Sequence, residues 1–216
     1  IQCLTWLWIH KNDKERLPDP TEIEKARFEE GYIIEEYAKK LFPDIVDLSE
    51  LNFNEQIEKT KEHTQKRVPL FQASFLHEDL YSRVDILLPV EEDKWDIIEV
   101  KSSTEAKKIH LEDLAFQKYV YEKAGLKIRK CFVLHVNKEY VKQGEINPQE
   151  LLMQTEVTEK VEAIKEVESR AINMIETING ECPDFQVDDL LTIEYENIAK
   201  YEFMEALPEN NIFEFV

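Results

Sequence analysis

The sequence has 216 residues, of which 43 % are hydrophobic and 10 % aromatic, which excludes a disordered or low-complexity chain. Its longest apolar run, residues 1–9, is too short to span a bilayer. The net charge of −19 opposes binding to nucleic acid, yet residues 101–142 carry ten basic and only five acidic side chains. This basic segment is either a solvated helix face or a surface that attracts an anionic substrate.

Glycine and cysteine are both scarce. With four glycines, no glycine-rich phosphate-binding motif is present. Three widely spaced cysteines do not suggest a disulfide framework and favour a reducing, cytoplasmic environment. The five histidines lack the spacing of a zinc site.

Two amphipathic helices are predicted first in the chain. Thr21–Phe42 has apolar residues at helical spacing, is capped by Asp19 or Thr21 and is stopped by Pro43. A second helix is predicted over Ser49–Gln65, with Ser49 as a weak cap and Asn52 three residues on. The apolar positions of the first helix are Ile33, Ile34, Tyr37, Ala38 and Leu41.

The periodicity then changes to that of strands. Two acidic turns, at residues 77–79 and 91–93, separate three short segments that are rich in β-forming residues. Strands so close in sequence predict an antiparallel meander. The three segments are Leu70–Leu76, Tyr81–Val90 and Trp95–Lys101.

A helix over His110–Ala124, ended by Gly125, leads to an apolar strand at Ile128–Val136, which predicts a crossover to a parallel neighbour. The C-terminal region predicts a long helix over Val157–Ile178, a loop at Cys182-Pro183 and a short strand at Ile212–Val216. The predicted fold class is therefore α/β, with a mixed central sheet flanked by helices.

The segment 95–101 carries the most suggestive chemistry. Glu99 and Lys101 share one face of the strand, and Asp85 lies among aliphatic residues on the preceding strand. A turn centred between Glu92 and Asp93 would bring Asp85 opposite Glu99. Two carboxylates so close predict a hard divalent cation, Mg²⁺ or Mn²⁺, with the carbonyl of Val100 as a third oxygen ligand. An ordinary carboxylate–lysine pair at a strand end is the alternative.

The next helix adds polar groups at a spacing of four residues. Asp113, Gln117 and Tyr121 share one helical face and can present an amide and a phenol toward Glu99 and Lys101. The alternative is a helix-surface stripe in which the tyrosine covers the core.

The ordered set Asp85, Glu99-Val100-Lys101, Gln117 and Tyr121 resembles the RecB-like branch of the PD-(D/E)xK nuclease superfamily. The flanks around residues 27–32, 41–43, 84–87, 99–104, 113–119 and 134–141 are similar to uncharacterised proteins related to CRISPR-associated RecB-like exonucleases. The resemblance covers about residues 3–182. It implies a nuclease domain over 1–182 with a core at about 21–142, and 183–216 is expected to be an acidic extension packed on the same domain.

The resemblance implies a restriction-endonuclease-like core and metal-dependent hydrolysis of DNA phosphodiester bonds, exonucleolytic in its action. Asp85 and Glu99 would bind the metal, and Lys101 would activate water or stabilise the transition state. Gln117 and Tyr121 would hold a substrate phosphate or brace the site. Substrate contacts are expected from Ser102, Ser103, Lys107, Lys108 and Lys118.

Two features depart from the family pattern. Where many relatives carry a metal-binding histidine, four residues after Gly31, this chain has Glu35, with Glu36 as its rival. The CRISPR-associated relatives bind an iron–sulfur cluster through four cysteines; here Cys3 and Cys182 match two of them, while Cys131 lies in a core strand. We therefore expect no complete cluster and expect the cysteines to be core residues.

The sequence thus predicts a DNA-binding nuclease with no membrane segment. Two alternatives belong to other classes. One is a degenerate nuclease fold that binds nucleic acid or protein without catalysis, and the other is an interaction protein that uses its acidic C-terminal region. Metal-dependent cleavage of DNA would distinguish the nuclease from both of these alternatives.

Overall fold

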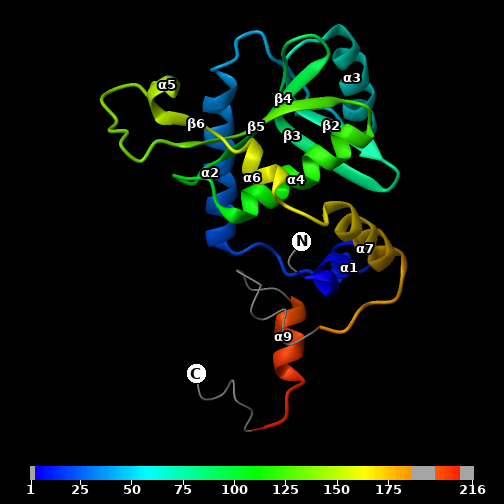
Figure 1. Cartoon of the computed structure of the whole chain (residues 1–216). Coiled ribbons are helices and arrows are strands. Elements are labelled where there is room, and N and C mark those ends of the chain that lie inside the picture. Colours follow the sequence, from blue (N-terminus) through cyan, green and yellow to red (C-terminus); the bar gives the residue numbers. More distant parts are fainter. Residues whose placement is uncertain (1–2, 186–197, 210–216) are drawn as a thin grey trace. The chain divides into compact units, whose positions relative to one another are not determined.

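The computed structural model describes residues 3–185 and 198–209 (Figure 1). The chain divides into two compact units, Glu22–Glu168 and the described parts of Ile1–Thr21 and Ser169–Val216. The domain expected over residues 1–182 spans both units. The strand expected at Ile212–Val216 lies outside the described residues. No helix in the described part of the chain is long and apolar enough to cross a membrane.

The larger unit contains a mixed six-stranded sheet, with the strands ordered as in the sequence. β2, β3 and β4 form the predicted antiparallel meander, and β4 pairs with β5 in parallel through a helical crossover. The predicted α/β class with a mixed, helix-flanked sheet is confirmed. The strands are β1 (Val46–Asp47), β2 (Leu70–His77), β3 (Leu80–Pro89), β4 (Lys94–Lys101), β5 (Lys127–Val136) and β6 (Leu152–Glu156).

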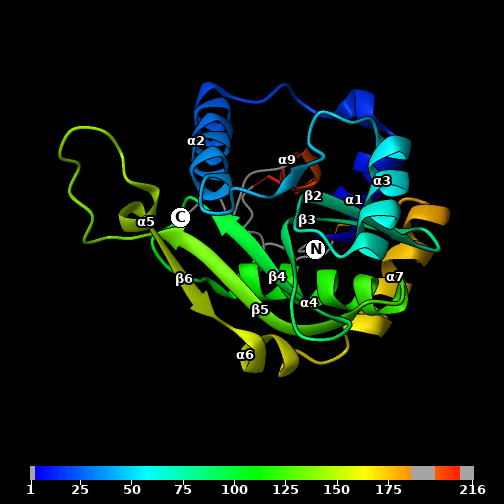
Figure 2. The same cartoon turned by 90° about the horizontal axis from the view of Figure 1, so that it is seen from above.

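Helices cover both faces of the central strands (Figure 2). Ile98 and Val100 of β4 pack with Ile34 and Ala38 of α2 (Glu22–Lys39) in one core cluster. Because side chains alternate along a strand, Glu99 points the other way, toward α4 (Lys108–Lys123). At the end of β4, one face therefore packs into the apolar core beside α2, and the other face carries Glu99.

The boundaries of the early helices differ from those predicted. α2 ends at Lys39 instead of Phe42, and Ile33 is 56 % exposed instead of buried. α3 (Phe53–Lys66) begins after Asn52, whose side chain accepts the backbone N–H groups of residues 54 and 55, so Ser49 is not its cap. A side-chain acceptor in the right place decides where the helix begins.

The prediction of one long helix over Val157–Ile178 was wrong. The chain instead forms α5 (Pro148–Leu151), strand β6, α6 (Thr158–Glu162) and α7 (Val167–Asn179). Glu166 has φ of +63°, a left-handed conformation that interrupts a helix. The sequence analysis did not predict β6, which pairs antiparallel with β5. It also did not predict the two-residue β1.

The smaller unit contains α1 (Leu4–Asn12), the short 3₁₀ turn Lys14–Arg16 and α9 (Ile198–Glu205). Thr5 Oγ1 donates to the carbonyl of Pro183 at 3.0 Å, and Trp8 Nε1 donates to that of Gly180 at 2.9 Å. All three cysteines are free thiols. Cys3 and Cys131 are buried, as expected, but Cys182 is exposed in the loop after α7.

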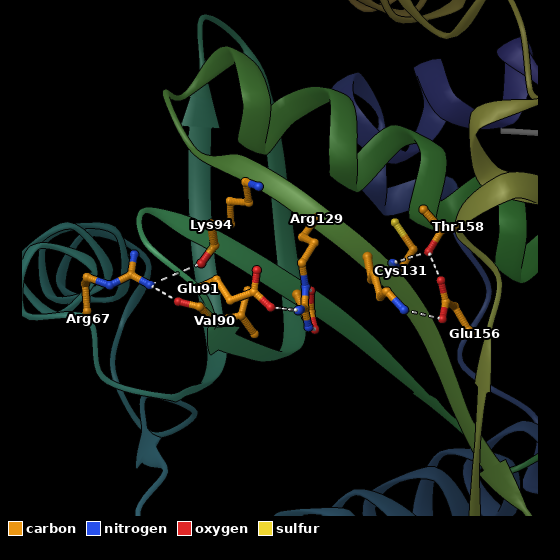
Figure 3. A network of polar contacts seen from close by, with 10 residues as sticks. Arg67, Val90, Glu91, Lys94, Arg129, Cys131, Glu156 and Thr158 are labelled. Atoms are coloured by element: carbon orange, nitrogen blue, oxygen red, sulfur yellow. Dashed lines mark hydrogen bonds and ion pairs between the residues drawn. The ribbon is translucent and has the colours of Figure 1, made fainter.

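Two arginines stabilise the turn end of the β3–β4 hairpin (Figure 3). Arg129 of β5 donates to both carboxylate oxygens of Asp96, at 2.9 and 2.6 Å, and to Glu91 at 3.3 Å. Arg67 donates to the carbonyls of Val90 and Lys94 on either side of the turn. Asp96 is only 5 % exposed, so its charge depends on Arg129.

We predict that Arg129→Met lowers the free energy of unfolding, because it leaves the Asp96 carboxylate buried without a counter-charge. Lys130→Met is the matched control: Lys130 pairs with Glu156 at an exposed position, so its loss should lower the free energy of unfolding clearly less. Urea denaturation measures both. Equal losses of unfolding free energy for the two variants would contradict the role of Arg129 as the counter-charge of buried Asp96.

The first turn of α4 contains a neutral histidine. Nδ1 of His110 accepts the backbone N–H of Lys107 at 3.1 Å, so this nitrogen carries no proton. Burial, together with the charges of Lys101 and Lys107, lowers the pKa of His110 to about 4. The stabilisation from neutral His110 is complete above pH 6.5, the pKa of an unfolded histidine, and is lost as the pH falls toward 4.

We therefore expect the stability difference between the wild type and His110→Asn to shrink between pH 7 and pH 4.5. The change should be about 1 kcal/mol once screening by solvent is allowed for. Chemical denaturation of both proteins at the two pH values measures it, and the other titrating groups cancel in the comparison. A difference independent of pH would contradict the neutral state of His110.

Candidate functional site

The site begins where β3 separates from β4. The β3–β4 pairing stops at Ile86 opposite Ile98, whereas the β2–β3 pairing continues to Leu80 opposite His77. Continued by one residue, the observed register places Asp85 opposite Glu99, as the turn predicted. Asp85 Oδ2 accepts the backbone N–H of Val100 at 2.7 Å, so a side chain satisfies a donor of β4 that β3 has left unpaired.

Glu99 lies at the centre of the polar contacts on the α4 side of β4. It is 7 % exposed, and its two carboxylate oxygens accept from Lys101 Nζ at 2.8 Å and from Gln117 Nε2 at 2.7 Å. Lys101 Nζ also lies 3.7 Å from Asp113 Oδ2. The structure thus brings together four of the five residues expected to be catalytic, and adds Asp113 from the same helical face.

Glu35 joins the site through a residue that the sequence analysis missed. Gln72 Nε2 of β2 donates to Glu35 Oε2 and to Asp85 Oδ1, each at 3.0 Å. Glu36, the rival candidate, pairs instead with Lys39 at 2.6 Å on the exposed side of α2. The only sequence signal that could have identified Gln72 as a site residue was its polar side chain within an otherwise apolar strand.

Negative charge dominates this cluster. Burial, followed by the charges of Glu99 and Glu35, raises the pKa of Asp85 well above its usual range. Burial also raises the pKa of Glu35, and Arg83 only partly opposes the shift. At Lys101 burial lowers the pKa, but Glu99 outweighs it and the net shift is upward. Four carboxylates, those of Asp85, Glu99, Glu35 and Asp113, thus lie around the one ammonium group of Lys101, an arrangement that favours a further cation.

The two residues of the predicted Gln-x-x-x-Tyr motif make different contacts. Gln117 reaches Glu99, whereas Tyr121 is fully buried, with its hydroxyl 3.1 Å from that of Ser82 and its ring against Phe75. Tyr121 therefore packs α4 onto β2 and β3, which fits the bracing role. Burial, with the charges of Glu99 and Asp85, raises the pKa of its hydroxyl well above its usual range.

Four of the five residues expected to contact substrate lie at the connection between β4 and α4, and the fifth lies elsewhere. Ser102 and Ser103 follow β4, and Ser103 Oγ donates to the carbonyl of Glu105. Lys107 is exposed before α4, and Lys108 lies 3.8 Å from Glu112. Lys118 does not join this group, because it pairs with Glu162 at 2.6 Å. The remaining basic side chains of this region that the sequence offered are also paired, namely Lys123 with Glu168, Lys127 with Asp93, Arg129 with Asp96 and Lys130 with Glu156.

The chemistry of the donors fits a hard divalent cation. Asp85, Glu99 and Glu35 offer carboxylate oxygens, and the side-chain oxygens of Gln72 and Gln117 are buried without a hydrogen-bond partner. Among residues 3–185 and 198–209, however, no three histidine, cysteine or acidic side chains are arranged closely enough to hold a metal ion. The amide of Gln72 donates to two of these carboxylates, Glu35 and Asp85, and so holds them next to each other.

Comparisons with known proteins add no further evidence about this site. No protein-family model matches the chain, and no curated protein matches it. The resemblance to RecB-like nucleases therefore rests on the motif residues themselves.

The crowding of carboxylates predicts that the site reduces stability when no cation is bound. We expect Glu35→Gln to raise the melting temperature in EDTA by about 2 °C, because it removes one charge from the cluster and keeps an acceptor for Gln72. Glu36→Gln, one residue away in an exposed ion pair, should change it by less. A melting temperature lowered by Glu35→Gln would contradict the repulsion described above.

Proposed function

We propose that the protein is a Mg²⁺- or Mn²⁺-dependent deoxyribonuclease with a RecB-like, restriction-endonuclease-like core, acting as an exonuclease. The observation that carries the proposal is the convergence of Asp85, Glu99, Lys101 and Gln117 where β3 separates from β4. A lone carboxylate–lysine pair would need neither the second carboxylate nor the amide.

Each residue has a role that its contacts support. Asp85 and Glu99, with the carbonyl of Val100 and with Glu35, would hold the divalent cation. Such a cation supplies Lewis-acid polarisation of the scissile phosphate. Lys101 lies between Glu99 and Asp113, which keep it an ammonium ion, so it acts by stabilising negative charge on the phosphate. Gln117 orients the Glu99 carboxylate.

Binding of DNA would depend on few contacts. Ser102, Ser103 and Lys107 lie between the end of β4 at Lys101 and the start of α4, and Lys108 is the first residue of α4. Because most other basic side chains of the segment are paired, we expect weak and strongly salt-dependent binding. The three free cysteines support a cytoplasmic location.

A specific observation favours a second candidate, a non-catalytic module that binds nucleic acid or protein. Ion pairs neutralise most of the basic segment that was expected to attract DNA. An interaction protein that binds a protein partner through its acidic C-terminal region is a separate alternative. The intact set of Asp85, Glu99 and Lys101 argues for the enzyme.

The test is cleavage of single- and double-stranded DNA with Mg²⁺, Mn²⁺ or EDTA at low salt. We expect cleavage only with metal, and a loss of at least about 100-fold in rate for Asp85→Asn, Glu99→Gln and Lys101→Met. Glu62→Gln is the control, since Glu62 pairs with Lys59 and Lys66 on exposed α3 and should leave the rate unchanged.

The outcomes separate the candidates. Binding of DNA without cleavage in any metal would support the non-catalytic module. Cleavage that survives all three site substitutions would reveal a contaminating nuclease and remove support for the proposal. The absence of binding even at low salt would leave only the interaction protein.

A further inference from the structure

Gln72 has a backbone conformation that is unusual for its position. It lies inside β2, is 4 % exposed and has φ of +58°, in the left-handed region where a residue with a Cβ atom is strained by about 1 kcal/mol or more. Pairing between β2 and β3 is recorded for Phe71 with Ile86 and for Ala73 with Val84, but not for Gln72 with Asp85. The irregularity therefore lies at the two residues that meet in the site.

The irregularity changes which face of the sheet the neighbouring side chains occupy. Phe71 belongs to the core cluster of α2, with Ile34, whereas Phe75 packs against Tyr121 of α4. In a regular strand, two residues four apart would share one face. The strained backbone at Gln72 thus lets β2 serve both layers and directs its own amide to the boundary between them.

The side chain adds a second cost. Both contacts of Gln72 Nε2 go to carboxylates, Glu35 on α2 and Asp85 on β3, while Gln72 Oε1 is buried without a partner. An unsatisfied buried amide oxygen costs about 1–3 kcal/mol. An aliphatic side chain would satisfy β2 better. A residue that is unfavourable in both backbone and side chain persists where function constrains it.

We propose that Gln72 is a positioning residue that sets the separation and orientation of Glu35 and Asp85 for a divalent cation. The inference rests on the proposed function, because it takes these two carboxylates as ligands. Gln72 is the one group seen to contact both of them in the described part of the chain, and these two ligands come from elements 50 residues apart in sequence. Hydrogen bonds that orient metal ligands affect affinity strongly.

The experiment measures Mn²⁺ affinity directly, by electron paramagnetic resonance of free Mn²⁺ with the full chain and no DNA. Gln72→Leu keeps a similar length and removes both hydrogen bonds. We expect its dissociation constant for Mn²⁺ to rise about 10- to 100-fold. Circular dichroism and thermal unfolding report whether the fold is retained.

A matched control separates positioning from packing. Gln56 is also 4 % exposed and also forms side-chain hydrogen bonds, to the carbonyl of Leu48 and to Ser74, but contacts none of the carboxylates. We expect Gln56→Leu to lower the melting temperature and to leave Mn²⁺ affinity unchanged. A purely structural role for Gln72 would give the same result for Gln72→Leu.

A second variant guards against misfolding. Gln72→Asn suits the left-handed backbone and keeps an amide that is one methylene shorter, so the fold should survive while Mn²⁺ binding weakens. Wild-type affinity in both Gln72 variants would overturn the inference and leave the proposed nuclease standing. Failure of the wild-type protein to bind Mn²⁺ at all would overturn the proposed metal site, and the inference with it.

Discussion

The chemistry of this protein depends on the separation of two adjacent strands. β3 stops pairing with β4 at Ile86, and the carboxylate of Asp85 takes over as the acceptor for the Val100 N–H. A buried backbone donor must find a partner, so this contact both ends the ladder and places a carboxylate next to Glu99. The parallel pairing of β4 with β5 continues to Lys101, which holds Glu99 and Lys101 on a rigid strand.

The same arrangement concentrates unfavourable electrostatics in one place. Burial and mutual repulsion raise the pKa of Asp85, and two amides and one ammonium group only partly offset the negative charge. Elsewhere the larger unit satisfies its buried charges, as at Asp96, where a two-point contact with Arg129 is complete. Deviations of this kind cluster at sites selected for function more than for stability.

The basic segment 101–142 is less available to an anionic substrate in the folded protein than its sequence suggests. The basic segment 101–142 reads as a surface for an anionic substrate, but folding brings acidic residues from other elements onto it, among them Glu162 and Glu168 beside α4. Net charge counted along the chain does not show this pairing. The remaining candidates for contact with a phosphate, Ser102, Ser103, Lys107 and Lys108, follow Lys101 within seven residues of the chain.

Local sequence patterns were enough to predict the central elements and their order. Alternating β-forming residues, acidic turns and the helix before Gly125 specified the meander and the crossover, because these are local patterns with strict periods. The spacing of Asp85 from the turn also predicted its register with Glu99. Tertiary structure alone decided that Glu35 and not Glu36 faces the cluster, that Gln72 bridges two carboxylates from its strained backbone, and that the lysines are paired. Each of these depends on contacts between residues far apart in the chain, which local periodicity cannot encode.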